Sequence, residues 1–366
     1  MKLNDLVLES EEILLSEFNI KPEKSKYEIH SNNKYKLITT LDNSEQTSQG
    51  VYLPRSLTAH LKKSSKFLQV NLLHEYFGHG LFCEHAIPGQ KIVSLEKSLE
   101  EIEKEMLGVT KLPENSHFQV NSNHPLFNKY KAKRGELKEF LSQNLHNYEG
   151  FAMWLEHFLA EKLNKKSLFD KKMSKVHPDF KELFEQFYDY SEVNGNFALT
   201  SKLGFPKYYN SNTLVDTLRR MYKKNFDSIK LVVLCGSKKP YSDIDLFIVS
   251  DKIKSTYNFW LDIVAKTPNE LEKELTNFSI EVSDPLFKGI LIRGDPGYHE
   301  QLKKRLLTQP ITKEAIKYNF QESAEQGKIG LMYPEGSRER RTALGYQKSF
   351  GKNARELEKG NRILIV

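Results

Sequence analysis

A glycine-serine pair followed by two aspartates is the sequence feature with the clearest chemical meaning. In LVVLCGSKKPYSDIDLFIV, Gly236 and Ser237 end one apolar run, and Asp243 and Asp245 begin the next. Side chains two residues apart on a strand point to the same face. Carboxylates held so close repel each other unless a cation lies between them, and Mg²⁺ favours all-oxygen sites. The pattern therefore predicts a magnesium site at the start of a strand, beside a turn that approaches phosphate.

A third carboxylate is expected on the neighbouring strand. Asp262 stands in the apolar run NFWLDIVA, where a charge is costly unless it is paired or metal-bound, and Glu281 in FSIEV is the alternative. Three carboxylates can hold two Mg²⁺ ions about 3.5–4 Å apart, which stabilise the attacking and leaving oxygens of an in-line displacement. We expect Gly236, Ser237 and Ser242 to bind the nucleotide, because glycine admits a phosphate close to the backbone.

Gly-Ser, a short loop, Asp-x-Asp on a strand and a later Asp together resemble the DNA polymerase β nucleotidyltransferase superfamily, especially its small stand-alone members. The resemblance spans about residues 213–295, and the KKPY loop is shorter than in many members. It implies transfer of a nucleoside monophosphate from an NTP to an acceptor. Asp243, Asp245 and Asp262 would be the metal ligands and catalytic residues. The sequence does not indicate the NTP, nor whether the acceptor is a protein, an RNA or a small molecule.

A second cluster, HEYFGH, contains the residue types of a zinc hydrolase. His74 and His79 are five residues apart, whereas histidines four apart share one face of a regular helix. Gly78 and Gly80 flank His79, so a local bulge or a helix end can re-aim it. Glu75, beside a ligand, is placed to act as general base on a zinc-bound water.

Zinc in a catalytic site needs a third protein ligand and one open position. The run NYEGFAMWLEHFLAE offers Glu149, with Glu156 two turns later on the same face of a helix. Cys83 and His85 are alternative ligands close to the first histidines. The sequence therefore leaves the third ligand open, with Glu149 preferred.

HEYFGH followed by EGFA resembles the glutamate-zincin metallopeptidases, in particular the tubulin-tyrosine carboxypeptidase family. This resemblance is confined to two short segments. It implies that His74, His79 and Glu149 are zinc ligands and that Glu75 is the catalytic base. The implied substrate is a peptide of unknown sequence.

The length of 366 residues predicts two domains, since one domain takes about 100–200 residues. A turn-rich segment at 199–212 marks the junction. We expect a mainly α, metallopeptidase-like α+β domain over 1–205. We expect an α/β nucleotidyltransferase fold with a small mixed sheet over 206–300, followed by C-terminal helices and a basic tail over 301–366.

Hydrophobic periodicity gives the expected elements of these domains. Strands are expected at 34–40, 50–53, 231–237, 244–249 and 258–265. Helices are expected at 5–18, 54–82, 91–107, 133–145, 148–163, 213–224, 268–277, 297–308 and 311–325. The tail from Pro334 onward is basic and rich in turn residues, which indicates a flexible, solvated segment.

Charge and cysteine content narrow the class of protein. The 55 basic and 48 acidic residues leave a net charge of +7, which permits binding to phosphate but does not demand it. Two distant cysteines, Cys83 and Cys235, do not make a disulfide framework and favour a reducing compartment. The sequence has neither a signal-peptide pattern nor the roughly 20 apolar residues of a membrane span. We expect a cytoplasmic protein with no membrane partner.

Three functions fit these observations. The first is a bifunctional enzyme that joins a Mg²⁺-dependent nucleotidyltransferase to a zinc metallopeptidase. The second is a nucleotidyltransferase whose N-terminal domain is purely structural. The third is an inactive nucleotide-binding or antitoxin-like protein that has lost turnover.

Overall fold

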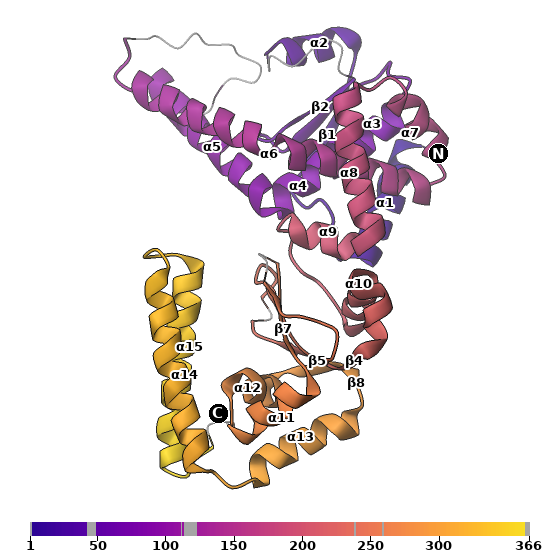
Figure 1. Cartoon of the computed structure of the whole chain (residues 1–366). Coiled ribbons are helices and arrows are strands. Elements are labelled where there is room, and N and C mark those ends of the chain that lie inside the picture. Colours follow the sequence, from indigo (N-terminus) through magenta and orange to yellow (C-terminus); the bar gives the residue numbers. More distant parts are fainter. Residues whose placement is uncertain are drawn as a thin grey trace. The chain divides into compact units, whose positions relative to one another are not determined.

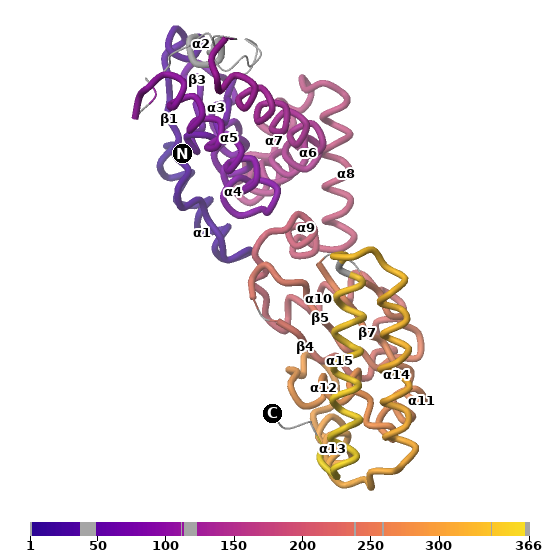
Figure 2. Tube along the Cα trace, turned by 90° about the vertical axis from the view of Figure 1, so that its left-hand side faces the viewer, coloured from indigo at the N-terminus to yellow at the C-terminus, as the bar shows by residue number. Residues whose placement is uncertain are grey.

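A computed structural model describes most of the chain and divides it into two compact units, Met1–Tyr208 and Tyr209–Val366 (Figures 1 and 2). The division lies close to the expected junction, and the expected C-terminal segment 301–366 belongs to the second unit. Both units are helix-rich with a small mixed sheet. The described residues are 2–41, 49–110, 112, 123–237, 239–257 and 260–362.

The first unit combines a three-stranded sheet with a set of helices. The strands are β1 (Lys26–His30), β2 (Gly50–Leu53) and β3 (Thr58–Lys62), in the order β1-β3-β2. β1 runs parallel to β3, and β2 runs antiparallel to it. The helical elements are α1 (Leu3–Phe18), α2 (Asn32–Leu41), α3 (Leu68–Leu72), the π-helix η1 (Leu73–His79), α4 (Gly80–His85), α5 (Ile87–Leu107), α6 (Phe127–Lys162), α7 (Lys166–Met173), α8 (Pro178–Asn194) and α9 (Asn196–Lys202).

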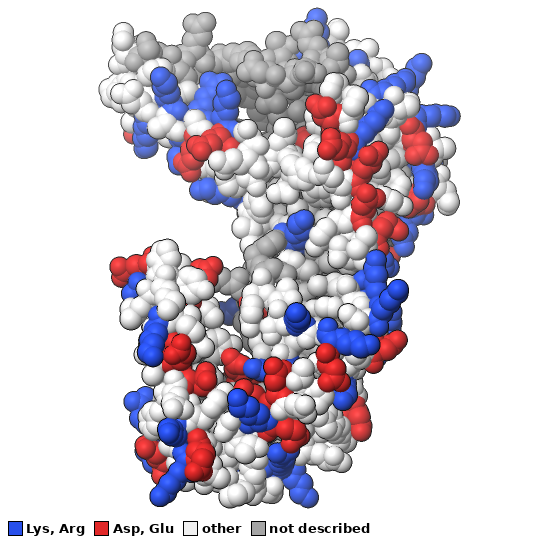
Figure 3. Space-filling view, in the orientation of Figure 1, with Lys and Arg blue, Asp and Glu red and all other residues white. Residues whose placement is uncertain are grey.

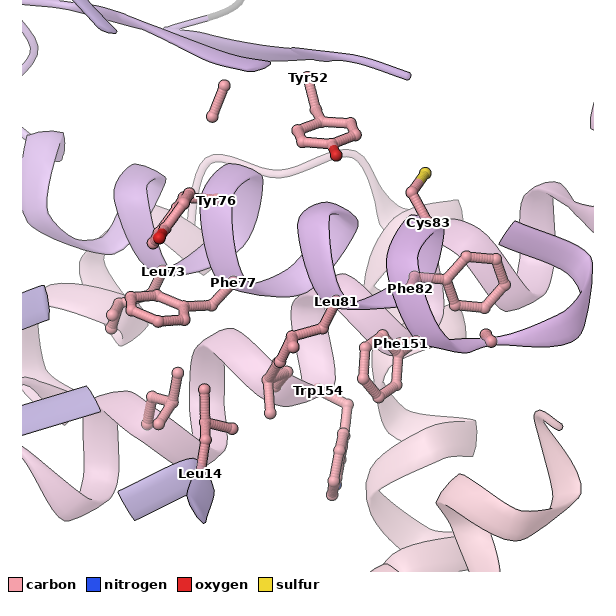
Figure 4. Packing of buried hydrophobic residues seen from close by; sticks show 14 of the residues in the cluster. Leu14, Tyr52, Leu73, Tyr76, Phe77, Leu81, Phe82, Cys83, Phe151 and Trp154 are labelled. Carbon is pink, nitrogen blue, oxygen red and sulfur yellow. The ribbon is translucent and has the colours of Figure 1, made fainter. Parts of the chain in front are cut away.

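The core of the first unit lies where η1 and α4 pack against α6. The run FLQVNLLHEYF is apolar almost all round, which indicates a buried helix, and Phe77 in it is completely buried. Figure 4 shows Leu81 and Phe82 directed at Phe151 and Trp154 of α6. This packing holds the two helical segments that carry the histidines and Glu149 at a fixed separation.

Three expectations about this unit were wrong. Residues 34–40, expected as a strand, lie in α2, where Tyr35 is buried, so tertiary packing outweighs the β-branched composition. Part of 54–82, expected as helix, forms β3, which gains ladder hydrogen bonds from strands on both sides. The helices expected at 133–145 and 148–163 are one continuous helix, α6, because no helix-breaking residue separates them.

The second unit is built around a five-stranded mixed sheet in the order β6-β7-β5-β4-β8. β5 and β7 are parallel, and the other neighbouring strands are antiparallel. Its strands are β4 (Ile229–Cys235), β5 (Ile244–Ser250), β6 (Thr256–Tyr257), β7 (Leu261–Lys266) and β8 (Ile290–Gly294). Its helical elements are α10 (Ser211–Tyr222), the 3₁₀ helix η2 (Lys223–Ser228), α11 (Pro268–Thr276), α12 (Ile280–Lys288), α13 (Pro296–Thr308), α14 (Lys313–Met332) and α15 (Arg338–Glu358).

The two central strands of this sheet are apolar on both faces. Val233 and Phe247 belong to a buried cluster that includes Leu271 and Leu275 of α11, while Val232 and neighbours on the opposite face are also buried. A sheet covered on both faces reads as continuous apolar runs, as LVVL and LFIV do. The interior is therefore rigid, and chemistry is confined to the ends of the strands.

The expectation of a flexible tail was wrong. Most of the segment after Pro334 forms α15, which runs beside α14 in both views (Figures 1 and 2). Ser337 caps α15 by accepting a hydrogen bond from the Arg340 amide at 3.2 Å. The buried residues Ala343, Phe350, Ala354 and Leu357 follow helical spacing among the basic residues. The high charge of the segment hid this apolar face.

Basic and acidic residues are intermixed on the face of both units drawn in Figure 3, as the near balance of 55 and 48 suggests. Among the described residues, no helix has the length and apolar character needed to cross a bilayer.

We predict that Gly78→Ala destabilises the first unit. A Cβ at Gly78 would lie 2.7 Å from the Cα of Ala152, so η1 and α6 must move apart. We expect the free energy of unfolding in urea to fall by about 1–3 kcal/mol. Gly135→Ala is the control. Gly135 lies in α6, where an added Cβ meets nothing within 4 Å, so this variant should be neutral or stabilised by roughly 0.5–1 kcal/mol. Equal losses in both variants would contradict the close approach of η1 and α6.

Candidate functional site

Three aspartates meet at one end of the second unit's sheet. Asp243 directly precedes β5, Asp245 lies within β5, and Asp262 lies opposite Asp245 on the parallel strand β7. One carboxylate oxygen from each lies within 4.8 Å of the other two, and all three side chains are half-buried. Anions this close favour a divalent cation between them, and the all-oxygen donor set suits Mg²⁺.

The parallel pairing of β5 and β7 explains why the aspartates meet. Parallel neighbours begin at the same edge of a sheet, so residues near their amino ends share that edge. Asp243 and Asp245 are two apart and share a face. The apolar residues that follow both Asp245 and Asp262 pin the strands in the interior, so the register that brings the carboxylates together is fixed by the core.

The turn after β4 closes the site from the other side. Gly236 has a φ of +67°, and a Cβ there would lie 1.8 Å from Oδ2 of Asp245. Glycine is therefore required both for the left-handed backbone and for the close approach. The Ser242 hydroxyl donates to the Ser237 hydroxyl at 3.1 Å, which ties the loop ends together. Residues 236, 237 and 242, expected to bind the nucleotide, thus lie around the carboxylates.

Tyr346 of α15 is a neighbour of this site that the sequence did not indicate. Burial raises the pKa of its hydroxyl, and the carboxylates of Glu281, Asp245 and Asp262 act in the same direction. Tyr346 lies near the aspartates because residues 338–358 form α15, a helix that was not expected from the sequence. Glu281, the alternative third carboxylate, lies on α12 and accepts a hydrogen bond from Lys266 at 2.6 Å.

The first unit brings the two histidines together through its π-helix. In η1 the hydrogen-bond repeat is i→i+5, so residues five apart lie on one face. Nε2 of His74 and Nε2 of His79 each lie 3.7 Å from Oε2 of Glu149. These three ligand atoms all lie within 4.8 Å of one another. Tetrahedral zinc with bonds of about 2.0–2.2 Å holds its ligands roughly 3.3–3.6 Å apart, so the donor set fits zinc.

Glu75 lies at the rim of this cluster, with Oε2 4.0 Å from Nε2 of His79. Burial raises the pKa of Glu75 to about 7. Gly50 of the edge strand β2 packs directly on it, since a Cβ at position 50 would lie 2.7 Å from Cγ of Glu75. The carboxyl group is thus held between the zinc-type ligands and the end of an edge strand.

A buried ion pair supports His74 from behind. Oε2 of the fully buried Glu156 lies 3.0 Å from Nδ1 of His74, which leaves Nε2 directed at Glu149. Lys172 of α7 donates to both oxygens of Glu156 at 2.9 and 2.8 Å. Burial lowers the pKa of His74, but Glu149 and Glu156 outweigh it and raise the pKa to about 9. Carboxylates behind a ligating histidine fix its orientation. The sequence did not indicate a role for Lys172, because the carboxylate that it neutralises lies in a different helix, α6.

His79 is held differently. Its ring stacks on Tyr148 at a centroid distance of 4.0 Å and an interplanar angle of 24°. Burial lowers its pKa to about 3. The alternative ligand His85 instead contacts the carbonyl oxygen of Lys21 at 2.9 Å. Cys83 is buried, and burial raises the pKa of its thiol.

Comparison with known proteins finds a weak structural similarity. No protein-family model matches the chain, and no curated protein matches it. The chain is similar to the crystal structure of a nucleotidyltransferase-like protein from Exiguobacterium sibiricum 255-15, with 15% sequence identity and a TM-score of 0.26. The match covers 42% of this chain and 60% of the length of that protein. Because a TM-score this low does not establish a shared fold, functional conclusions must come from the geometry of the side chains.

We predict that Gly236→Ala disrupts the aspartate cluster. The added methyl group would occupy the position of the Asp245 carboxylate, so that side chain must turn away. We expect Mg²⁺ or Mn²⁺ affinity, measured by calorimetric titration, to fall about 10–100-fold, as when groups that position a ligand are lost. Gly345→Ala, on α15 where a Cβ meets nothing within 4 Å, is the matched control. Unchanged affinity in Gly236→Ala would show that Asp245 takes no part in metal binding.

Proposed function

We propose that the second unit is a Mg²⁺-dependent nucleotidyltransferase that moves a nucleoside monophosphate from an NTP to an acceptor. The observation that carries this proposal is the approach of Asp243, Asp245 and Asp262 to within 4.8 Å of one another. The turn at Gly236 supports it, because its backbone lies directly against Asp245 and backbone amides in such turns can bind phosphate.

The chain's own groups have distinct roles in this reaction. Asp243, Asp245 and Asp262 would hold Mg²⁺, which would neutralise charge on the triphosphate and on the attacking and leaving oxygens. The backbone at Gly236 and the hydroxyl of Ser237 hold the phosphate oxygens. Asp262 takes the proton from the acceptor group as its oxygen or nitrogen attacks the α-phosphorus. The bond from the α-phosphorus to the bridging oxygen breaks, and pyrophosphate leaves with the electron pair.

We predict that Asp262→Asn abolishes nucleotide transfer. The variant loses a metal ligand and the proton acceptor, so label transfer from α-³²P-NTPs to acceptors in a cell extract should fall by about 100-fold or more. Asp251→Asn is the control, because Asp251 follows the opposite end of β5 and lies 3.7 Å from Lys230. Transfer that persists in Asp262→Asn, or that is lost equally in both variants, would remove the assignment. NTP binding without any transfer in the wild-type protein would favour the inactive nucleotide-binding alternative.

For the first unit we propose zinc-dependent hydrolysis of a peptide bond. The π-helix carries this proposal, because it brings His74 and His79 to the same carboxylate at equal distances of 3.7 Å. π-helical turns are rare in proteins, and those that occur are often found at functional sites. The fully buried Glu156 and its partner Lys172 add support. Burying an ion pair costs free energy, and a carboxylate behind a histidine holds the ring in the orientation that a metal needs.

The residues around this cluster can carry out the hydrolysis. His74, His79 and Glu149 would hold zinc, which would polarise the scissile carbonyl and make a bound water more acidic. Glu75 takes a proton from the attacking water and passes it to the leaving amine. β2 is an edge strand in the order β1-β3-β2, and Gly50 at its start packs on Glu75. An extended peptide that pairs with this edge would pass the carboxyl group of the base.

We predict that Glu75→Gln separates zinc binding from hydrolysis. The variant keeps the three ligands, so its zinc content should equal that of the wild type, while cleavage of a peptide library followed by mass spectrometry falls about 100-fold or more. His79→Ala should lose the zinc ion of this cluster and, with it, cleavage. The control His157→Gln alters another buried histidine of α6 that lies 3.9 Å from Glu161. If wild-type protein cleaves no peptide and Glu75→Gln leaves transfer intact, the first unit has a structural role.

A further inference from the structure

We propose that Glu28, His30 and His60 form a second zinc site, on the face of the first unit's sheet that points away from the helical core. Glu28 and His30 are two apart on β1 and share a face. In the parallel register Glu28 lies opposite His60. Ala59 and Leu61, on either side of His60, are completely buried in the core. The three side chains therefore project from the opposite face, over which α2 lies.

The ligand atoms of this cluster converge on one point. Nε2 of His30 lies 2.8 Å from Nδ1 of His60. Oε2 of Glu28 lies 3.3 Å from the first of these nitrogens and 3.8 Å from the second. A triangle with these sides has a circumradius of about 2.0 Å, close to zinc–nitrogen and zinc–oxygen bond lengths of about 2.0–2.2 Å. The 2.8 Å between the two ring nitrogens is shorter than the roughly 3.3–3.6 Å between ligands of tetrahedral zinc, so the rings would move apart by about 0.5 Å as the ion enters.

The donor chemistry selects zinc rather than magnesium. Imidazole nitrogens suit Zn²⁺ and other late transition metals, whereas Mg²⁺ takes oxygen ligands. The charge of Lys34 acts on both rings and opposes a cation, which the carboxylate of Glu28 offsets. Glu28 is exposed, which leaves the fourth position to solvent.

A direct hydrogen bond between the two rings explains the cluster less completely. One ring would donate its proton to the other, and the 2.8 Å separation satisfies that pair. The lone pair of the accepting nitrogen would then face the carboxylate oxygen of Glu28 as well. Three lone-pair atoms around one point share a single proton in this arrangement, whereas a divalent cation satisfies all three at once.

The site has a structural consequence for the edge strand. His60 is paired with Val51 of β2 as well as with Glu28 of β1. An ion that joins β1 to β3 therefore fixes the strand on which β2 is aligned. Its ligands differ from His74, His79 and Glu149, so the proposal does not depend on the peptidase assignment.

Zinc stoichiometry of the full-length protein tests this inference. The protein is stripped with a chelator, dialysed, loaded with zinc in millimolar Mg²⁺ to occupy the aspartates, and desalted before elemental analysis. We expect the wild type to hold two zinc ions per chain, and Glu28→Gln and His60→Gln each to hold one fewer. His157→Gln should match the wild type. Wild-type zinc content in both Glu28→Gln and His60→Gln would overturn the site.

Two measurements keep the result interpretable. Glu28 is exposed, so we expect Glu28→Gln to stay folded, as measured by circular dichroism. If His60→Gln does not fold, the zinc content of Glu28→Gln alone tests the site. In the His79→Ala background, cobalt(II) absorption bands should persist and then disappear on adding Glu28→Gln. Absence of cobalt bands in His79→Ala alone would also overturn the second site. If His79→Ala removes no zinc, the peptidase assignment fails while this site stands.

Discussion

Repulsion between side chains that converge on one point is the constraint on which the candidate sites depend. Asp243, Asp245 and Asp262 hold carboxylate oxygens within 4.8 Å of one another, an arrangement that costs free energy without a cation. The apolar strands that follow these residues are buried on both faces of the sheet, and their fixed register offsets that cost. The fold thus keeps ready a charge arrangement that a divalent ion would complete, which is the preorganisation that the proposed phosphoryl transfer requires.

Departures from regular backbone occur where the chemistry needs them. A regular α-helix would place His79 away from His74, and the π-helix corrects the five-residue spacing. Gly236 takes a left-handed conformation so that the turn can touch Asp245. Gly50 has the same relation to a carboxyl group, that of Glu75. In each case a glycine or an extra residue per turn brings the backbone closer to a functional group than a regular element with side chains allows.

The residues that cluster in the structure were easier to predict from the sequence than the architecture, for a physical reason. The apolar runs around Asp262 and in the central strands are local signals, so they indicate that a segment is a strand and which of its residues share a face. Residues 34–40 form a helix instead of the expected strand, and α15 was not expected as a helix. Both structures depend on which distant parts of the chain cover them, and local composition carries no information about that. Lys172 and Tyr346 approach their sites from separate helices, and their roles follow only from tertiary packing. The bulge expected near His79 was identifiable because the five-residue spacing is itself a local mismatch.

The donor atoms, rather than affinity alone, would allow one chain to use the two proposed metals. The aspartate cluster of the second unit offers oxygen alone and suits a cation that keeps several waters, such as Mg²⁺. The histidine clusters of the first unit offer imidazole nitrogen, which binds zinc far better than it binds magnesium. Millimolar Mg²⁺ would therefore not displace zinc from the proposed site at His74 and His79, and trace zinc would compete poorly for aspartates occupied by Mg²⁺ and triphosphate. The histidine nitrogens belong to the first unit and the all-oxygen set to the second, so the two proposed sites would work in one solution and their linkage in one chain would cost neither proposed activity.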